Sequence, residues 1–292
     1  MNLLYLTFGN NTSVHLQAAF SIYSFLGKEK QINSITIITD SPTFYTHFAQ
    51  HVNIICISKE ELKEWEGPHH FFWRAKIKAI EKLCHLYPNE PIVYLDTDTF
   101  LYKDIAGIKN RLANNKALMH TNEGYLSTKN SKTEKKMWRQ ITNKKFGAIL
   151  MQKSDCMWNA GVVATPNTTN GADLVLALNI CDEMCAAGVS KRLIEQYALS
   201  LALEKTYGLE AAEDFIAHYW STKQIWNVKI SDFFLKAYFA QWNDTTIIEE
   251  MGLIDKTKIP VSEKVKNTGI RLKALVDKLF PNKKLIYLKK NK

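Results

Sequence analysis

Two aspartates that stand two residues apart are the side chains of this sequence best suited to chemistry. Asp96 and Asp98 follow a short apolar run, Ile92–Leu95, and precede the apolar pair Phe100 and Leu101. Two carboxylates at the end of a buried strand repel each other and resist desolvation. A divalent cation relieves both effects, and such hard oxygen ligands suit Mg²⁺ or Mn²⁺, which also bind phosphate. The pair predicts a metal site for a phosphate-bearing ligand; the simpler alternative is a turn with two solvated carboxylates.

Basic side chains open the helix that is predicted over Phe72–Leu86, just before the aspartates. Arg74 and Lys78 are four residues apart and share one face of this helix, whereas Lys76 points elsewhere. A guanidinium or an ammonium group beside the aspartates would neutralise a diphosphate. The alternative is that these residues form a solvated helix face.

A short polar stretch precedes a predicted strand over Gly161–Ala164. It contains Asn159, Ala160 and Gly161. An amide can bond to sugar hydroxyls, and small residues let a ligand approach the backbone. By itself, the stretch is also an ordinary junction between a loop and a strand.

Two later segments add further candidates. Glu195 and Gln196 stand near the start of an apolar helix, Leu193–Leu203. A carboxylate beside an amide could orient an acceptor or stabilise a developing cation at a sugar carbon, although an acid at this position also simply favours the helix dipole. His218 ends an apolar run and could complete a metal site with the aspartates. Lys223 could reach the same phosphates.

Strands and helices alternate in the first half of the chain. This alternation predicts the α/β class, with a Rossmann-like, doubly wound and mostly parallel sheet. Ligands of such sheets bind beyond the carboxyl ends of the strands, where Thr7, Asp40 and Asp96 lie. The predicted strands are Leu3–Phe8, Ser34–Thr39, Val52–Ile57 and Ile92–Leu95, and the predicted helices are Val14–Leu26 and Phe72–Leu86.

The second half of the chain is less regular. Residues 120–155 are polar, which predicts loops or a mobile flap. Helices are predicted over Asp173–Ala187 and Leu193–Glu204, and a short strand over Phe215–His218.

The composition excludes several classes of protein. With 292 residues and 46% hydrophobic content, the chain can form an ordinary folded core. Its five cysteines are odd in number and form no CxxC pair, which disfavours zinc and predicts reduced thiols in the cytoplasm. The start of the chain reads as a strand and not as a signal peptide, and no apolar run is long enough to span a membrane.

The positive charge is concentrated at the C-terminal end. The chain carries +9 overall, yet residues 256–292 hold twelve Lys or Arg against two acids. We therefore predict a domain boundary near Lys256, with a main domain over 1–255 and a basic, amphipathic helical tail over 256–292. The tail is expected either to contact an anionic membrane surface at the inner face or to pack on the body, and no basic aromatic face favours nucleic acid. Its apolar face would consist of Leu272, Leu275, Val276 and Leu279.

Taken in order, these segments resemble the nucleotide-sugar glycosyltransferases of GT-A fold, and are similar to the glycogenin-like and lipopolysaccharide galactosyltransferase-like families. The resemblance covers about residues 1–226. The stretch after His218 departs from the family pattern, because it has no glycine, no proline after the lysine and a shorter step to Lys223. The stretch from Arg74 to Asp96 is also longer than in those families. The matching motifs are Asp96-Thr97-Asp98, which resembles the DxD motif, Arg74 or Lys76, Asn159-Ala160-Gly161, Glu195-Gln196, His218 and Lys223.

The resemblance implies a metal-dependent transfer of a sugar from a nucleoside diphosphate donor, a UDP-sugar, to a hydroxyl of a glycan or a lipid-linked acceptor. It favours retention of configuration and implies Mn²⁺ or Mg²⁺ held by Asp96, Asp98 and His218. Glu195 and Gln196 would line the sugar and acceptor side as catalytic residues. The donor would contact Thr7, Asp40, Arg74, Lys76, Asp96, Thr97, Asn159, Ala160, Gly161 and Lys223.

Two other functions remain open on the sequence. A sugar nucleotidyltransferase would need a glycine-rich, basic loop after the first strand, but Gly9–Thr12 holds one glycine and no basic residue. A dehydrogenase is disfavoured because GxGxxG is absent. A membrane-docked protein that binds nucleotide sugars without catalysis is the second alternative, and intact Asp96, Asp98 and His218 count against it.

Overall fold

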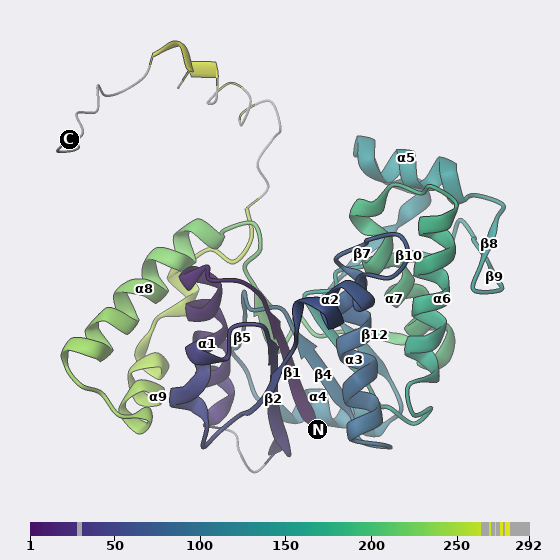
Figure 1. Cartoon of the computed structure of the whole chain (residues 1–292). Helices are drawn as coiled ribbons and strands as arrows, with labels where there is room; N and C mark the ends of the chain where they lie inside the picture. The colour runs from purple at the N-terminus through teal and green to yellow at the C-terminus, as the bar shows by residue number, and fades with distance from the viewer. Residues whose placement is uncertain (28–30, 264–268, 270–271, 273–274, 277, 281–292) are drawn as a thin grey trace, which may run out of the picture.

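A mostly parallel sheet with helices on both sides forms the body of the protein (Figure 1). The computed structural model describes residues 1–27, 31–263, 269, 272, 275–276 and 278–280. The strands of the main sheet are β1 (Asn2–Thr7), β2 (Ser34–Thr39), β3 (Asn53–Cys56), β4 (Ile92–Leu95), β6 (Ala117–Met119), β11 (Val162–Thr165) and β12 (Leu209–Ala211).

The order of these strands is β12-β6-β11-β4-β1-β2-β3. β1 pairs in parallel with β2 and β4, β2 with β3, and β12 with β6, whereas β11 runs antiparallel between β4 and β6. The predicted α/β class with a doubly wound, mostly parallel sheet is therefore confirmed. The four strands predicted in the first half of the chain agree with β1 to β4 to within one residue at each end.

Each face of the sheet carries its own hydrophobic core. Alternate residues of β1 point to opposite faces, so Leu3 and Tyr5 belong to one core and Leu4 to the other. Burying such a side chain contributes about 1.5–3 kcal/mol, which pins the register of each strand. The helices of the first core are α1 (Thr12–Leu26), α8 (Lys223–Phe239) and α9 (Asp244–Leu253), and those of the second are α3 (Arg74–Leu86), α6 (Ala172–Ala186) and α7 (Ile194–Tyr207).

Residues 120–155 contain a helix and several strands, so the prediction of loops is wrong, while the mobile flap stays a prediction. The segment contains β7 (Asn122–Tyr125), α5 (Lys132–Ile141) and a hairpin. α5 is mainly charged, and only a few apolar residues anchor it, among them the buried Met137 and Ile141. This narrow stripe is what makes the segment look like a loop in the sequence. The hairpin strands are β8 (Lys145–Phe146) and β9 (Ile149–Leu150), and β7 pairs with β10 (Cys156–Trp158).

A small antiparallel pair brings distant parts of the chain to the end of β4. β5 (Thr99–Leu101) follows the two aspartates and pairs with β13 (Ile216–His218). In this register His218 stands opposite Thr99, directly beside Asp98. Other helices are α2 (Lys59–Glu66), α4 (Ala106–Ala113) and the short 3₁₀ helices η2 (Pro42–Phe48), η3 (Leu126–Thr128), η4 (Lys191–Leu193) and η5 (Lys256–Lys258).

The chain returns from α9 to the start of α8 before the C-terminal segment. Pro260 O accepts a hydrogen bond from Trp226 Nε1 at 3.0 Å, and the Glu263 amide donates to Ser221 Oγ at 3.0 Å. Much of the predicted tail, including Lys264, lies outside the described residues. Its predicted apolar residues Leu272, Leu275, Val276 and Leu279 are described and are 46–62% exposed.

Candidate active site

Asp96, Asp98 and His218 converge at the carboxyl end of the central strands. One ligand atom of each lies within 4.8 Å of the others. Asp96 and Asp98 occupy the turn between β4 and β5, and His218 ends β13. Asp98 and His218 are 2% and 7% exposed, so the group lies below the surface. The three side chains that the sequence assigned to a metal are therefore neighbours in space.

Asp98 lies at the centre of this group. Its Oδ2 is 3.3 Å from His218 Nε2 and 3.0 Å from Lys223 Nζ. Burial alone would raise the pKa of Asp98, but His218 and Lys223 outweigh burial and lower the pKa to about 2. Among the described residues, none is placed to complete a hydrogen bond of good geometry to Oδ2. A buried anionic oxygen therefore keeps a lone pair for a cation.

Asn159 orients the imidazole of His218. Its Oδ1 is 3.0 Å from His218 Nδ1 and accepts a hydrogen bond from the Gly161 amide at 3.0 Å. Its Nδ2 donates to Glu123 Oε1 at 3.2 Å, which defines the orientation of the amide. Nδ1 of His218 therefore donates to Asn159, and Nε2 is the ring nitrogen that faces Asp98.

Gly161 explains why small residues follow Asn159. A Cβ built on Gly161 would lie 2.1 Å from His218 Nδ1, closer than any side chain can approach. The Gly161 carbonyl also accepts a hydrogen bond from the Asp96 amide at 2.8 Å. The absence of a side chain at Gly161 thus lets the chain that enters β11 lie against the His218 ring. The Gly161 carbonyl at the same time holds the Asp96 backbone.

Lys76 is the basic residue of α3 that reaches the site. Its Nζ lies 3.2 Å from Asp96 Oδ1 and 3.1 Å from Glu195 Oε1, and it donates to the Ala160 carbonyl at 3.1 Å. Burial alone would lower the pKa of Lys76, but Asp96 and Glu195 outweigh burial and raise it, so the group stays an ammonium ion. Burial also raises the pKa of Glu195, an effect that Lys76 opposes.

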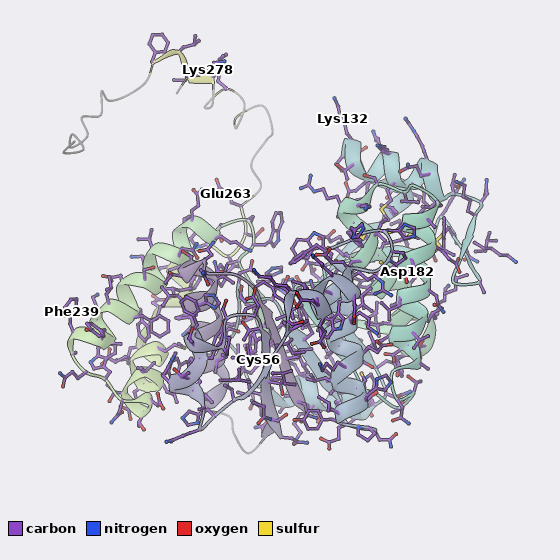
Figure 2. All side chains as sticks on the ribbon, in the orientation of Figure 1. Cys56, Lys132, Asp182, Phe239, Glu263 and Lys278 are labelled. Atoms are coloured by element: carbon purple, nitrogen blue, oxygen red, sulfur yellow. The ribbon has the colours of Figure 1, made fainter. Side chains whose placement is uncertain are left out.

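Arg74, the other basic residue named from α3, points away from the aspartates. Its Nε and Nη2 donate to the carboxylate of Asp182 on α6 at 2.7 and 3.0 Å, and its Nη1 donates to the Trp65 carbonyl. Figure 2 shows Asp182 in the layer of helices beside the sheet. Lys78, which shares the face of Arg74, pairs with Glu81. Arg74 thus links α3 to α6, whereas the Lys78 pair lies within α3.

Gln196 is linked to Asn159 through an acid that the sequence reasoning missed. Gln196 Nε2 donates to Glu123 Oε2 at 3.2 Å, and Asn159 donates to the other oxygen of the same carboxylate. Glu123 lies on β7, inside the segment that was expected to be a loop or flap. Its strand register beside β10 is a tertiary property, and no local motif marks the residue.

The residues predicted at the ends of the first two strands lie in different surroundings. Thr7 is buried, accepts a hydrogen bond from Tyr45 at 3.1 Å and lines the pocket described below. Asp40 accepts hydrogen bonds from the Gly9 amide at 2.8 Å and from Ser41 Oγ at 2.9 Å. Asp40 therefore holds the loop that follows β1. Thr97 donates to Gln17 on α1 at 3.1 Å.

A pocket of about 260 Å³ opens beside the group formed by Asp96, Asp98 and His218, which we call the metal group. Aromatic side chains form one wall, and Phe72 and Trp73 are 40% and 50% exposed there. Aromatic faces of this kind can stack on a planar base. The sequence analysis gave no role to Phe72 and Trp73, although adjacent aromatic residues before a basic helix were a usable signal. The lining residues are Leu6, Thr7, Phe8, Val14, Phe72, Trp73, Ala75, Lys76, Tyr94, Asp96, Thr97, Asp98 and Lys223.

The charges of the group fit a divalent cation. Three carboxylates, those of Asp96, Asp98 and Glu195, face two ammonium groups, those of Lys76 and Lys223. The ligand set of two carboxylates and one imidazole suits Mn²⁺ or Mg²⁺. With Asp98 Oδ2 and His218 Nε2 only 3.3 Å apart, the residues present fit the ion that the sequence predicts.

Comparison with known proteins adds a likeness of fold only. No protein-family model matches the chain, and no curated protein matches it significantly. Similar solved structures include the galactosyltransferase LgtC in complex with donor and acceptor sugar analogs, at 12% identity and a TM-score of 0.46, covering 73% of each chain. Mouse xyloside xylosyltransferase 1 has 11% identity and a TM-score of 0.46, covering 72% of this chain and 85% of that one.

A third similar structure belongs to a different class of enzyme. It is a putative glucose-1-phosphate thymidylyltransferase from Bacillus anthracis, with 12% identity and a TM-score of 0.44, covering 79% of this chain and 95% of that one. Glycosyltransferases, the class that the motifs resemble, are thus among the structures that this chain is similar to. Likeness at this level transfers no activity, so the function is inferred from the site itself.

Proposed function

We propose that this protein is a metal-dependent glycosyltransferase that moves a sugar from a nucleoside diphosphate donor, a UDP-sugar, to a hydroxyl of a glycan or a lipid-linked acceptor. One observation carries the proposal: Asp96, Asp98 and His218 meet Lys76 and Lys223 at the carboxyl ends of parallel strands. A diphosphate needs this combination of a cation site and fixed positive charge.

Each side of the site has its own task. Asp96, Asp98 and His218 would hold Mn²⁺ or Mg²⁺, which supplies a Lewis acid for the charge on the leaving diphosphate. Lys223 is 47% exposed and can turn from Asp98 to a phosphate without leaving a cavity. Phe72 and Trp73 provide the wall for the base. Lys76 fixes Asp96 and Glu195 at the floor of the pocket.

The sugar and the acceptor would lie on the side of Asn159, Glu195 and Gln196. Retention of configuration requires the leaving phosphate, a carboxylate or an amide on the reacting face of the sugar. Glu195 is buried and held by Lys76, which suits a group that stabilises positive charge on the sugar. Gln196 and Asn159, joined through Glu123, supply amide groups for sugar hydroxyls. We favour retention for these reasons and from the family resemblance.

The loop after β1 disfavours a sugar nucleotidyltransferase. Such an enzyme cradles a triphosphate with free backbone amides and basic side chains. Here the Gly9 amide donates to the Asp40 carboxylate, and Asn11 caps the start of α1 by accepting from the Ser13 amide. An acid therefore occupies the place where the triphosphate would need a donor.

Titration calorimetry with UDP, in the presence and absence of Mn²⁺, tests the proposal directly. We expect tighter binding of UDP with the ion, and metal-dependent hydrolysis of at least one UDP-sugar. The substitution Asp98→Ala should abolish both. Unchanged turnover in that variant, with its fold intact by circular dichroism, would refute the transferase assignment.

We also propose that the basic C-terminal segment binds an anionic membrane surface, with the protein peripheral to the inner face. The charge of residues 256–292 and the exposure of Leu272, Leu275, Val276 and Leu279 support this. No helix of the described residues has the length and apolar character of a membrane span. A lipid-linked acceptor or a surface glycan made at the membrane, such as lipopolysaccharide or capsule, would suit this location.

A further inference from the structure

Helix α5 carries positive charge along one face. Four exposed bases follow one another at spacings of three, one and three residues, which places them on one side of the helix. The apolar side is opposite, and Met137 on that side is buried. Figure 2 shows Lys132 at the outer edge of the molecule. The four bases, which we call the basic face of α5, are Lys132, Lys135, Lys136 and Arg139.

No acid balances the basic face. Residues 126–155 hold eight Lys or Arg against two acids, whereas residues 1–255 as a whole are close to neutral. Of the two acids, Asp155 is buried and Glu134 pairs with Lys129 at 3.9 Å. Within the part of the chain that the structure describes, none of the four bases forms an ion pair with an acid. The face therefore presents unbalanced positive charge to any molecule that approaches it.

This face differs from the usual solvated side of a surface helix. Exposed helices normally mix acids and bases, as α2 does over Lys59–Glu66. Like charges four residues apart destabilise a helix, and the basic face contains two such pairs. Binding of an anionic group between the bases would relieve this repulsion. The charge pattern thus fits an anionic partner better than it fits water alone.

The basic face lies on the acceptor side of the candidate active site. Glu123 of β7 joins Asn159 and Gln196, the amides proposed to face the sugar and the acceptor. β7 leads through η3 into α5, and Tyr125 at the end of β7 is 50% exposed (Figure 1). α5 begins nine residues after Glu123, a stretch that spans at most about 32 Å when fully extended. A glycan of several sugars can therefore contact the site and α5 at once.

We propose that the acceptor is an anionic glycan and that the basic face of α5 binds its phosphate or carboxylate groups. The inference rests on the proposed transferase function, whose acceptor it defines by charge. The hydroxyl that receives the sugar would lie beside Asn159 and Gln196, and charged groups farther along the glycan would contact α5. Arg139 can hold a phosphate or a carboxylate with two hydrogen bonds. Tyr125, between the site and α5, offers an exposed ring to a sugar.

The surroundings of the basic face favour a glycan over a bilayer or a nucleic acid. A helix that docks on a bilayer inserts apolar side chains beside its bases. Among residues 126–149, all of which the structure describes, no large apolar side chain is exposed. Single-stranded nucleic acids bind where exposed aromatic rings accompany the basic residues. The aromatic residue of α5, Trp138, packs against the hydrophobic core instead.

Lysine footprinting of the full chain tests the proposal, because it reports α5 separately from the basic C-terminal segment. Mass spectrometry measures the acetylation rate of each lysine with a galacturonate hexamer, with linear hexaphosphate or with neutral maltohexaose. We expect the galacturonate or the phosphate hexamer to slow acetylation of the three α5 lysines at least about fivefold, and maltohexaose to change it less than about twofold. Lys59 and Lys109, exposed lysines of α2 and α4, are the internal controls.

Two variants test the residues themselves, with Lys132 and Lys135 kept as reporters. Lys136→Gln/Arg139→Gln should raise the hexamer concentration for half-protection at least about fivefold, whereas the control Lys59→Gln/Lys63→Gln, which removes the same charge from α2, should change it less than about twofold. Tyr125→Ser should weaken protection by the galacturonate hexamer and leave protection by hexaphosphate unchanged, since hexaphosphate has no sugar ring.

Three results would overturn the inference. The first is protection of the C-terminal lysines without protection of α5, and the second is equal protection of α5 by maltohexaose and the anionic hexamers. The third is stronger protection of α5 by a thymidine hexanucleotide or by anionic vesicles, which would assign the face to nucleic acid or to a membrane. UDP binding with Mn²⁺ is measured on the same samples. If UDP does not bind, the transferase proposal falls, and the role of α5 in holding an acceptor falls with it even where α5 binds the hexamers.

Discussion

Gly161 and His218 share a space that holds only one side chain, because a Cβ on Gly161 would lie 2.1 Å from Nδ1 of the imidazole. The imidazole is 7% exposed and is held by Asn159 on one side and Asp98 on the other. Replacing Gly161 by Ala must therefore displace His218 or bend β11, and the displaced ring would lose its bond to Asn159.

We expect Gly161→Ala to lower stability by about 1–3 kcal/mol, as overpacking does, and to weaken Mn²⁺ binding. Gly252→Ala is the control, since a Cβ at this helical position meets nothing within 4 Å. The control should be neutral or slightly stabilising. Urea denaturation and Mn²⁺ titration calorimetry measure the two effects, and an unchanged Mn²⁺ affinity in Gly161→Ala would contradict the site geometry.

Asp98→Asn keeps the shape of the side chain and removes its charge. Because Asp98 supplies a buried anionic oxygen to the metal group, Mn²⁺ affinity should fall by about tenfold or more. Asp232→Asn, on the exposed side of α8, should leave the affinity unchanged. Titration calorimetry measures the Mn²⁺ affinity of both variants. Equal affinities would mean that Asp98 is not a ligand of the ion.

Lys76→Met tests the buried charge at the floor of the pocket. Without the ammonium group, the Asp96 and Glu195 carboxylates lose their shared partner, so unfolding free energy should drop by about 3–5 kcal/mol. Lys82→Met, on the same helix, breaks the half-exposed pair with Glu61 and should cost no more than about 1 kcal/mol. Similar losses in the two variants would mean that the carboxylates do not rely on Lys76.

Arg74→Ala and Lys223→Ala should separate stability from ligand binding. Arg74 holds α3 to α6 through Asp182, so its loss should lower the melting temperature and leave UDP affinity unchanged. Lys223 is half-exposed beside Asp98, so its loss should weaken UDP binding with little change in melting temperature. Differential scanning fluorimetry and UDP titration report both quantities. If Arg74→Ala instead weakened UDP binding and Lys223→Ala lowered the melting temperature, Arg74 would belong to the phosphate site.

Replacing the aromatic wall tests how the base is bound. The double variant Phe72→Ser/Trp73→Ser removes two exposed rings beside the pocket, so stability should barely change. Loss of stacking should weaken UDP binding by about tenfold, while inorganic pyrophosphate, which has no base, should bind as before. An equal loss for both ligands would show that these rings act on the phosphate side.

The local sequence was sufficient to predict the strands in which nearly every residue is buried. Ser34–Thr39 and Ile92–Leu95 are short apolar runs between turn residues, and they form β2 and β4 as predicted. The residues of the site could be named to the same degree. Each signal lies within a few residues of sequence: the spacing of Asp96 and Asp98, the small residues before β11, and the late histidine. α5 escaped prediction because few of its residues are apolar.

Other properties of the site depend on how the elements pack. The choice between Arg74 and Lys76 is set by the rotation of α3 against the sheet, which turns Lys76 toward the aspartates and Arg74 toward α6. His218 meets Asp98 only because β13 pairs with β5 across more than a hundred residues. Glu123 joins Asn159 and Gln196 in the same way. The residues that do the chemistry could thus be named from their neighbours in the chain, while their partners were decided by long-range strand pairing and helix packing, which no local pattern encodes.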